Sequence, residues 1–596
     1  MIAERRAEVR FEYITTPDSL ERAVKELSAQ KEVGFDTETT ELDPRNGQLR
    51  LVQFATSRSA YLIDLFSFDR QDRASLKPLI DFLESPQTLK IAHNAKFDLK
   101  WIRHHLGCEV NAIFDTYLAS LLISAGEGER RHSLADIAQF FLNIELDKSE
   151  QVSDWAAAEL SDSQLSYAAR DALVMPELAE KIREVLVSEG LTDTARIEFE
   201  CLMPIADMEL NGIYLDKELW LQQIERIKHR RDLLAAELQE QLSAGVAQRG
   251  LFGFSEINLD SQPQLIEALT NLGIPIGSST SSDALLPLAA KYPIIEKLID
   301  FRHAQKRLSG FGENFLEFIH PASGRIHADF RQIGAPSGRF SCSNPNLQQI
   351  PAENAYRQCF RAPEGKKFVI ADYSQIELRI LAELSADEGF INAFESGIDF
   401  HSATASMVFK VPNESITPQQ RSFAKRLNFG IVYGIGAERF GRMTGISNSQ
   451  AESVMRRYFS SFPQMDSYLR ETGNRVIEER SARTLGGRLI RLNFDPQSRE
   501  SIGAARRYGV NSIIQGTAAD ILKIALRKIQ DSLSQNSGKL VNIVHDEIII
   551  ECDDSQAEET AQILRNSMLS AGKAFLERVP LDVELRITDN WAKSGS

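Results

Sequence analysis

The chain has 596 residues, of which 43% are hydrophobic, and its formal net charge at pH 7 is −16. This length suits several domains, and no apolar run approaches the roughly 20 residues that a membrane-spanning helix needs. The first ten residues are charged, so we expect no signal peptide. The five cysteines stand far apart, which favours reduced thiols in a cytosol-like compartment over disulfides or a zinc site.

Two carboxylates stand on a predicted strand near the N-terminus. Residues 33–38 predict this strand, and Asp36 and Glu38 are two residues apart, so both side chains point to the same face. The runs 49–55 and 60–65 predict further strands of the same sheet. Because Asp-x-Glu occurs by chance in many proteins, this pair indicates a site only together with further acids.

Three more residues complete the acidic set. Asp98 stands where an apolar run passes into a predicted helix, and Tyr167 and Asp171 are four residues apart, on one face of another helix. Ordinary surface acids are the alternative, but the ordered set Asp-x-Glu, Asn-x-x-x-Asp and Tyr-x-x-x-Asp resembles the 3′–5′ exonuclease family. The resemblance implies that Tyr167 orients the attacking water. It also implies that two metal ions are held by Asp36, Glu38, Asp98 and Asp171.

The middle of the chain is mostly helical. Residues 177–239 predict helices with a break near Asn211–Gly212, and the charged, amphipathic run 219–242 suits a protruding helical arm. Residues 325–330 predict the start of a strand. It leads into a polar loop at 337–351, whose length and Gly and Pro residues favour a functional role over a simple turn.

Two acidic strand ends follow. Residues 368–371 predict a buried strand, so Asp372 lies at the end of a core strand, where a carboxylate is unfavourable unless it is paired or binds a metal. For a lone Asp, the preferred interpretation is a cap of the next helix. Residues 541–551, however, predict a hairpin whose tip carries Asp546 and Glu547. Side by side, the two sites could bind two divalent cations and support phosphoryl transfer.

A helix with a cationic and an aromatic half is predicted from Arg421 to Tyr433. These residues, with Lys425 and Phe429 between them, stand four apart. A helix drifts only about 40° per such step, so all four share one face over roughly 18 Å. Two cations followed by two aromatic rings fit a triphosphate and then a sugar and base. A plain amphipathic helix with a basic end is the alternative, although Leu427 and its neighbours supply a separate apolar face.

Charge is distributed unevenly along the chain. Residues 419–507 hold 16 Lys and Arg side chains against 8 Asp and Glu. Such a stretch can contact phosphates while acidic surface elsewhere sets the total charge; a solvated basic face is the alternative. A further helix follows, on which Arg507, Asn511 and Gln515 repeat the four-residue spacing.

The two acidic stretches resemble a known family. The runs Asp372-Tyr-Ser-Gln-Ile-Glu-Leu-Arg379 and Val544-His-Asp-Glu547 are similar to two palm motifs of family A DNA polymerases, the bacterial DNA polymerase I type. The resemblance implies an α/β and α+β multidomain fold, in which a ribonuclease H-like exonuclease domain precedes a right-hand polymerase domain. The implied boundaries are 1–190 for the exonuclease domain and 191–596 for the polymerase domain, with a thumb at about 196–330, a palm at about 331–385 and 508–596, and fingers at about 386–507.

The resemblance also implies roles around the nucleotide. Asp372 and Asp546 hold two Mg²⁺ ions, which Mn²⁺ could replace, and Glu547 is an accessory acid near the primer. Glu377 packs beneath the sugar, where a ribose 2′-hydroxyl would stand. Lys425 binds the triphosphate and protonates the leaving group. The implied nucleotide-binding residues are Arg421, Lys425, Phe429, Tyr433, Glu377 and Gln375.

Further residues are implied to contact DNA. Arg339 reaches the minor groove at the primer terminus, where every correct base pair presents a similarly placed acceptor. Gln348 is a weaker candidate. Ile513 stands where the family commonly has Pro, a difference that concerns helix geometry. The implied DNA-binding residues are Arg339, Gln348, Arg507, Asn511, Gln515 and His545.

We therefore expect a monomeric DNA-dependent DNA polymerase with 3′–5′ proofreading, which binds primer–template DNA and dNTPs in replication or repair and does not associate with membranes. We expect it in the cytoplasm of a bacterium or a phage-infected host; an organelle is an open alternative. The chain begins directly at the exonuclease, so we expect no 5′-nuclease domain. A stand-alone exonuclease or a non-catalytic scaffold would lack acids that are present. Glu377 argues against an RNA-making relative, whereas the choice of template stays open.

Overall fold

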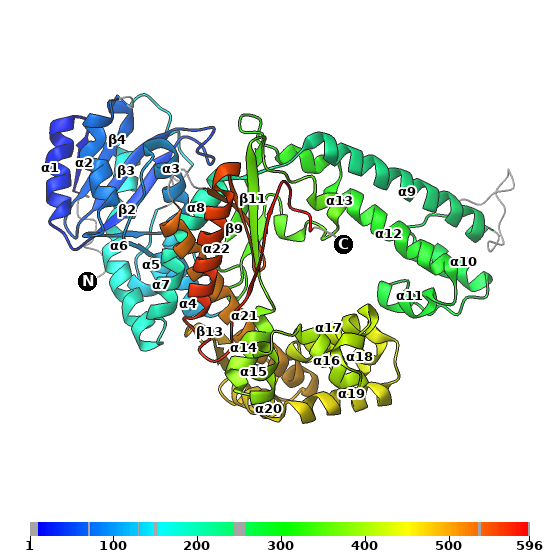
Figure 1. Ribbon diagram of the computed structural model, residues 1–596. Coiled ribbons are helices and arrows are strands. Elements are labelled where there is room, and N and C mark those ends of the chain that lie inside the picture. The colour runs from blue at the N-terminus through cyan, green and yellow to red at the C-terminus, as the bar shows by residue number, and fades with distance from the viewer. Residues whose placement is uncertain are drawn as a thin grey trace.

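The computed structural model describes residues 10–69, 72–128, 130–147, 150, 152–243, 257–533 and 538–593. Figure 1 shows an N-terminal part built on one sheet, a second sheet at the centre of the molecule, a long helical arm and a lobe of short helices. The arm and the lobe extend from the same side of the central sheet. None of the described helices is long and apolar enough to cross a membrane.

The N-terminal sheet has six strands in the order β1-β4-β3-β2-β5-β6. Strands β2, β3 and β4 form an antiparallel meander, and the other pairings are parallel. The predicted strands at 33–38, 49–55 and 60–65 correspond to the meander. The strands are β1 (Phe11–Ile14), β2 (Glu32–Thr39), β3 (Leu49–Ala55), β4 (Ala60–Asp64), β5 (Leu89–Ala92) and β6 (Ile113–Asp115).

The helix α6 lies unusually close to strand β2. Gly34 in β2 has no side chain, and a Cβ atom there would lie 2.0 Å from the carbonyl oxygen of Ala172 in α6. The close approach brings the polar side chains of α6 next to those of β2. The helices of this part are α1 (Pro17–Ser28), α2 (Arg73–Glu84), α3 (Lys96–Leu106), α4 (Thr116–Ser124), α5 (Leu134–Leu142) and α6 (Asp162–Ser188).

The helical arm follows the predicted break at Gly212, which has a φ of +59°. The long helices α9 and α12 pack along each other (Figure 1). The strand expected at 325–330 is divided at His327, whose ring nitrogen contacts the carbonyl oxygen of Glu209 at 2.9 Å. The elements are α7 (Thr192–Glu200), α8 (Leu202–Asn211), β7 (Ile213–Tyr214), α9 (Lys217–Ser243), α10 (Gln262–Asn271), α11 (Ser282–Ala289), α12 (Pro293–Phe311), β8 (Arg325–Ile326), β9 (Asp329–Arg331) and β10 (Ser341–Ser343).

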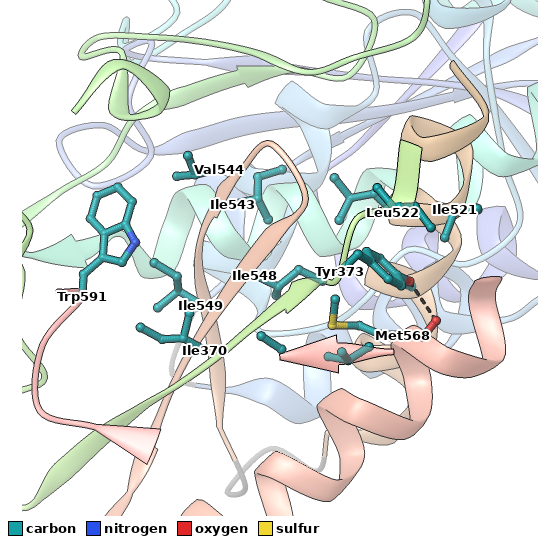
Figure 2. Packing of buried hydrophobic residues seen from close by; sticks show 14 of the residues in the cluster. Ile370, Tyr373, Ile521, Leu522, Ile543, Val544, Ile548, Ile549, Met568 and Trp591 are labelled. Carbon is teal, nitrogen blue, oxygen red and sulfur yellow. Dashed lines mark hydrogen bonds between the residues drawn. The ribbon is translucent and has the colours of Figure 1, made fainter. Parts of the chain in front are cut away.

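The central sheet is antiparallel, in the order β14-β15-β11-β16. Its apolar residues form the largest core, part of which Figure 2 shows: Ile370 and Ile549 lie in the sheet, and the Tyr373 hydroxyl donates to the Met568 carbonyl oxygen at 2.8 Å. The helices α21 and α22 pack against this sheet. The elements are β11 (Lys366–Tyr373), α21 (Arg499–Ser532), β14 (Lys539–Val544), β15 (Glu547–Asp553), α22 (Ala557–Gly572) and β16 (Val583–Thr588).

The lobe of short helices contains the predicted cationic–aromatic helix, α17. Thr417 and Gln420 form a capping box at its start, and a proline occupies its first turn. The helix ends at Val432, so Tyr433 is its C-cap residue. The short helix α13 (Asn354–Arg357) lies apart from this lobe, next to α9 (Figure 1). The elements that follow it are α14 (Ile376–Ser385), α15 (Glu388–Glu395), α16 (Phe400–Phe409), α17 (Pro418–Val432), α18 (Ala437–Thr444), α19 (Asn448–Ser461), α20 (Pro463–Glu478), β12 (Ser481–Arg483) and β13 (Leu489–Arg491).

Candidate active sites

The two acidic strand ends meet in the central sheet. Asp372 lies near the end of β11 and pairs in register with Glu547 of β15 on one side and Glu584 of β16 on the other. Asp546 lies in the turn before β15, next to His545, which has a φ of +58°. The carboxyl groups of Asp372 and Asp546 lie close enough for their charges to repel each other. Residues about 170 positions apart in the sequence therefore form one acidic pair.

Burial and mutual repulsion make this pair resist ionisation. Burial first, and then the charges of Asp546 and Glu547, raise the pKa of Asp372 to about 8. Burial also raises the pKa of Asp546 to about 6. The Oδ1 atom of Asp372 is buried, and no hydrogen-bond donor among the described residues faces it. A bound cation would relieve both the repulsion and this unmatched oxygen, so the pair fits a metal site.

Glu547 is held by three donors next to the acidic pair. Its carboxylate is buried and accepts hydrogen bonds from the Trp591 indole at 2.5 Å, from Arg586 at 3.0 Å and from Arg357 at 3.5 Å. It therefore does not line the cavity beside Asp372. Glu547 is nevertheless the register partner of Asp372, and its charge contributes to the raised pKa of that residue.

A cavity of about 870 Å³ opens next to the acidic pair. We call it the α17 cavity, because the face of α17 that carries Arg421, Lys425 and Phe429 forms one wall. Arg507 and Asn511 do not line it; they lie on the less buried side of α21, as does Gln515, which reaches the cavity wall. The expected site residues that line it are Arg339, Gln348, Asp372, Gln375, Glu377, Arg421, Lys425, Phe429, Tyr433, Gln515, His545 and Asp546.

Several side chains of the α17 cavity are already paired. Arg421 binds Asp399 through two hydrogen bonds of 2.9 and 2.8 Å. Phe429 stacks with Tyr433 at 6.5 Å between ring centroids. The sequence analysis did not identify Asp399. Asp399 also caps α16 by accepting a hydrogen bond from the Ser402 backbone amide.

The C-terminal residues add a cation to this wall. The Nζ atom of Lys593 lies 3.8 Å from Asp372 Oδ2, and its backbone is fixed by two 3.0 Å hydrogen bonds with Asn354. Trp591, two residues earlier, is completely buried. The sequence analysis missed both residues because nothing in a tail sequence indicates where it folds back.

The exonuclease-like acids form a second cluster. Asp36 and Glu38 lie on β2, and the Gln53 amide of β3 donates to both, at 3.1 and 3.4 Å. Thr37 donates to Asp98 at 2.6 Å. Tyr167 and Asp171 stand one turn apart on α6, close enough for the Asp171 charge to raise the pKa of the Tyr167 hydroxyl. These expected residues line a second cavity, of about 1160 Å³, which we call the β2 cavity.

The β2 acids also resist ionisation. Burial and the neighbouring carboxylates raise the pKa values of Asp36 and Glu38 well above their ordinary range. Burial raises the pKa of Asp98 to about 7 and that of Asp171 to about 6. Four carboxyl groups gathered in one cavity fit a metal site. Among the described residues, however, no three such side chains already converge in ligand geometry, so bound ions would have to draw them together.

Comparisons with known proteins identify a family for each of the two parts of the chain. Residues 227–593 match the model of DNA polymerase family A, and residues 11–187 match a 3′–5′ exonuclease model. A DNA polymerase I of Aquifex aeolicus is 33% identical; the match covers 98% of this chain and all of that protein. A DNA polymerase I of Pseudomonas aeruginosa is 32% identical over 98% of this chain, which spans 66% of that longer protein.

A solved structure agrees as well. The polymerase domain of Pol1 from M. smegmatis, in complex with a DNA primer–template and dNTP, superposes with a TM-score of 0.82 at 28% identity and covers 98% of this chain and 99% of that one. The expected fold class, an exonuclease domain followed by a family A polymerase domain, is confirmed. Enzymes of both kinds depend on metal ions. The chain belongs to DNA polymerase family A and carries a 3′–5′ exonuclease domain before its polymerase domain.

Proposed function

We propose that the α17 cavity extends a DNA primer with dNTPs on a DNA template and that the β2 cavity removes nucleotides from the 3′ end. The supporting observation is that Asp372 and Asp546, from distant parts of the sequence, share one cavity with the cationic and aromatic face of α17. Two carboxylates beside two cations match the charge pattern of an incoming nucleotide with its metal ions.

In the α17 cavity, Asp372 and Asp546 would hold two Mg²⁺ ions, and Mn²⁺ could take their place. Bound there, these ions would activate the primer 3′-hydroxyl and neutralise charge on the leaving pyrophosphate. Lys425 and Arg421 bind the triphosphate, and Lys425 donates a proton to the pyrophosphate. Arg421 binds Asp399 through Nε and Nη2, so its Nη1 can donate to a phosphate oxygen while both bonds to Asp399 remain.

The remaining wall of the α17 cavity positions sugar and base. Glu377 closes the space beside the sugar, and Phe429 and Tyr433 pack against the nucleotide. Arg339 reaches the minor groove of the primer terminus, where all correct pairs present an acceptor. The other proposed nucleotide and DNA contacts are Gln375, Gln348, Arg507, Asn511, Gln515 and His545.

In the β2 cavity, four carboxylates would hold the metal ions, and Tyr167 orients the attacking water. Tyr167 is suited to this role because burial and the Asp171 carboxylate raise the pKa of its hydroxyl, which stays protonated and can donate. The proposed ligands are Asp36, Glu38, Asp98 and Asp171.

We further propose the subdomains of a right hand. The arm from α9 to α12 is the thumb, the central sheet with α21 and α22 is the palm, and the lobe from α15 to α20 is the fingers. A monomer that acts on DNA in the cytoplasm fits five unpaired, buried cysteines and relatives from bacteria.

Separate inactivation of the two sites tests the proposal. Asp546→Ala should abolish extension of a labelled primer but keep 3′ shortening, and Asp36→Ala with Glu38→Ala should do the reverse. Asp531→Ala, which removes an exposed acid from α21, is the control and should keep both activities. A folded variant that lost both activities through one site would contradict the two-site assignment.

A further inference from the structure

Four charged side chains form a completely buried network behind the α17 cavity. Glu198 Oε1 lies 2.5 Å from Arg488 Nη2 and 2.5 Å from Lys523 Nζ, and Arg488 lies 2.6 Å from Asp520 Oδ1. All four side chains are at most 1% exposed. They come from three distant elements: α7, the loop before β13, and α21. The network therefore joins α7 to α21, the helix that carries Gln515.

Stability alone is a weak reason for such a network. Moving four charges out of water costs several kcal/mol per ion, and well-packed apolar side chains often stabilise a core equally well. Burial and then the contacts with Lys523 and Arg488 act on Glu198 in opposite directions, and the net effect lowers the pKa of its carboxyl group. A carboxylate that stays charged in the core can hold several donors in fixed positions.

The network holds both ends of one loop. At one end, the Gln332 amide donates to the Glu198 backbone oxygen at 2.8 Å and to its carboxylate at 3.1 Å. At the other end, Lys523 donates to the Gly338 carbonyl oxygen at 2.7 Å. The next residue is Arg339, whose guanidinium lines the α17 cavity.

The loop also packs directly on the network and on α21. Gly338 has a φ of +82°, and a Cβ atom there would lie 2.4 Å from Arg488 Nε. A Cβ atom at Gly516, next to Gln515, would lie 2.8 Å from the Ser337 carbonyl oxygen. Because these contacts are so close, the backbone before Arg339 can adopt only one position.

We infer that Lys523 and Glu198 are positioning residues that fix the 332–338 loop and thereby aim Arg339 at the primer terminus. The inference rests on the proposed minor-groove role of Arg339. Lys523 does not line the α17 cavity, so it acts through Arg339 rather than on DNA.

The test uses a primer whose terminal guanine carries carbon in place of N3, the minor-groove acceptor. The wild-type enzyme should extend this primer roughly 10- to 150-fold more slowly than the normal one, as expected for one hydrogen bond to a charged group. Lys523→Met should reduce this ratio at least about threefold. In an Arg339→Ala background, Lys523→Met should change the ratio no further. Lys528→Met, on the same helix, is the control and should keep the wild-type ratio.

Further variants and measurements distinguish a folding defect from a loss of the Arg339 contact and from a loss of the loop's attachment to the network. Thermal unfolding and 3′ shortening of single-stranded DNA report whether Lys523→Met folds. Gln332→Leu removes the loop tether while all four charges remain, and should also lower the ratio. If Arg339→Ala left the ratio unchanged, the proposed role of Arg339 would fail. If Arg339→Ala lowered it but Lys523→Met and Gln332→Leu slowed both primers equally, the network would be only structural.

Discussion

Arg339 and Glu377 form an ion pair in the α17 cavity, and the Glu377 carboxylate lies close enough to the Tyr433 hydroxyl for its charge to act on that group. Burial and then the Glu377 charge raise the pKa of the Tyr433 hydroxyl, which therefore stays a donor. Glu377 thus links the loop at Arg339 to the end of α17. Because Glu377 is only 8% exposed, the space beside it is closed on the protein side.

The first prediction concerns selection of the sugar. Glu377→Ala should open the space that a ribose 2′-hydroxyl needs and raise ribonucleotide incorporation, relative to deoxynucleotide, by at least about tenfold. Normal extension should also slow, because Arg339 and Tyr433 lose their shared partner. Single-nucleotide kinetics with dNTP and rNTP measure both effects. Glu388→Ala, an exposed acid of α15, is the control. An unchanged ratio would remove Glu377 from the sugar site.

Much of the fold and of both sites was predictable where the pattern is local. Asp36 and Glu38 share a face because alternate residues of a strand point to the same side. Arg421, Lys425 and Phe429 share a face of α17 because residues four apart in a helix lie nearly above one another. The structure shows both arrangements. Long, strongly patterned segments such as α9 also form at the expected places.

Other features depend on tertiary packing that a local pattern does not encode. Glu547 follows Asp546 directly, yet β15 turns it towards Trp591 and Arg586. The buried network at Glu198 joins residues separated by about 290 to 325 positions. Each of its members reads in the sequence as an ordinary surface charge, and only the packed structure shows that the charges compensate one another.

A second prediction follows from the raised pKa values in the β2 cavity. Folded, metal-free protein holds protons on Asp98 up to about pH 7, whereas the unfolded chain releases them near its ordinary value of 3.8. The native state therefore binds more protons between these values, and its free energy of unfolding falls as pH rises through this window. Asp98→Asn should stabilise the metal-free protein at pH 8, by on the order of 1 to 4 kcal/mol, and have little effect at pH 4.

Thermal unfolding in EDTA and in Mg²⁺ checks this pH dependence. Divalent cations should stabilise the wild-type protein at pH 8 more than Asp98→Asn, since the variant lacks one ligand charge. If the wild-type protein and Asp98→Asn were equally stable at pH 8 without metal, the pKa of Asp98 would not be raised in the folded protein.

The third prediction concerns the close packing of α6 against β2. Gly34→Ala would place a Cβ atom 2.0 Å from the Ala172 carbonyl oxygen, so α6 must move away from β2. Tyr167 and Asp171 move with it, and we expect 3′ shortening to slow at least about tenfold while extension is kept. Gly128→Ala, where nothing lies within 4 Å of the new atom, is the matched control. Normal shortening by Gly34→Ala would mean that the position of α6 does not limit the reaction.

The last prediction concerns Phe429, whose ring lines the α17 cavity one turn after Lys425. The centroid of the Phe429 ring lies 5.7 Å from that of the His401 ring, and the Phe429 ring stacks on Tyr433. Phe429 therefore lies at the middle of the cationic and aromatic face. A normal nucleotide can donate its 3′-hydroxyl to its own phosphate oxygen. A dideoxynucleotide cannot, and Phe429 offers no donor in its place, so the analogue leaves an acceptor unpaired.

Phe429→Tyr should supply the missing donor and lower discrimination against dideoxynucleotides. A hydrogen bond to a charged group contributes roughly 1.5–3 kcal/mol, which corresponds to a decrease of roughly 10- to 150-fold. Single-turnover incorporation of a dNTP and of its dideoxy analogue, on both proteins, measures the ratio. If Phe429 were only a packing residue of α17, the added hydroxyl would lower both rates together. A constant ratio with two slower rates would therefore place the sugar of the incoming nucleotide elsewhere in the cavity.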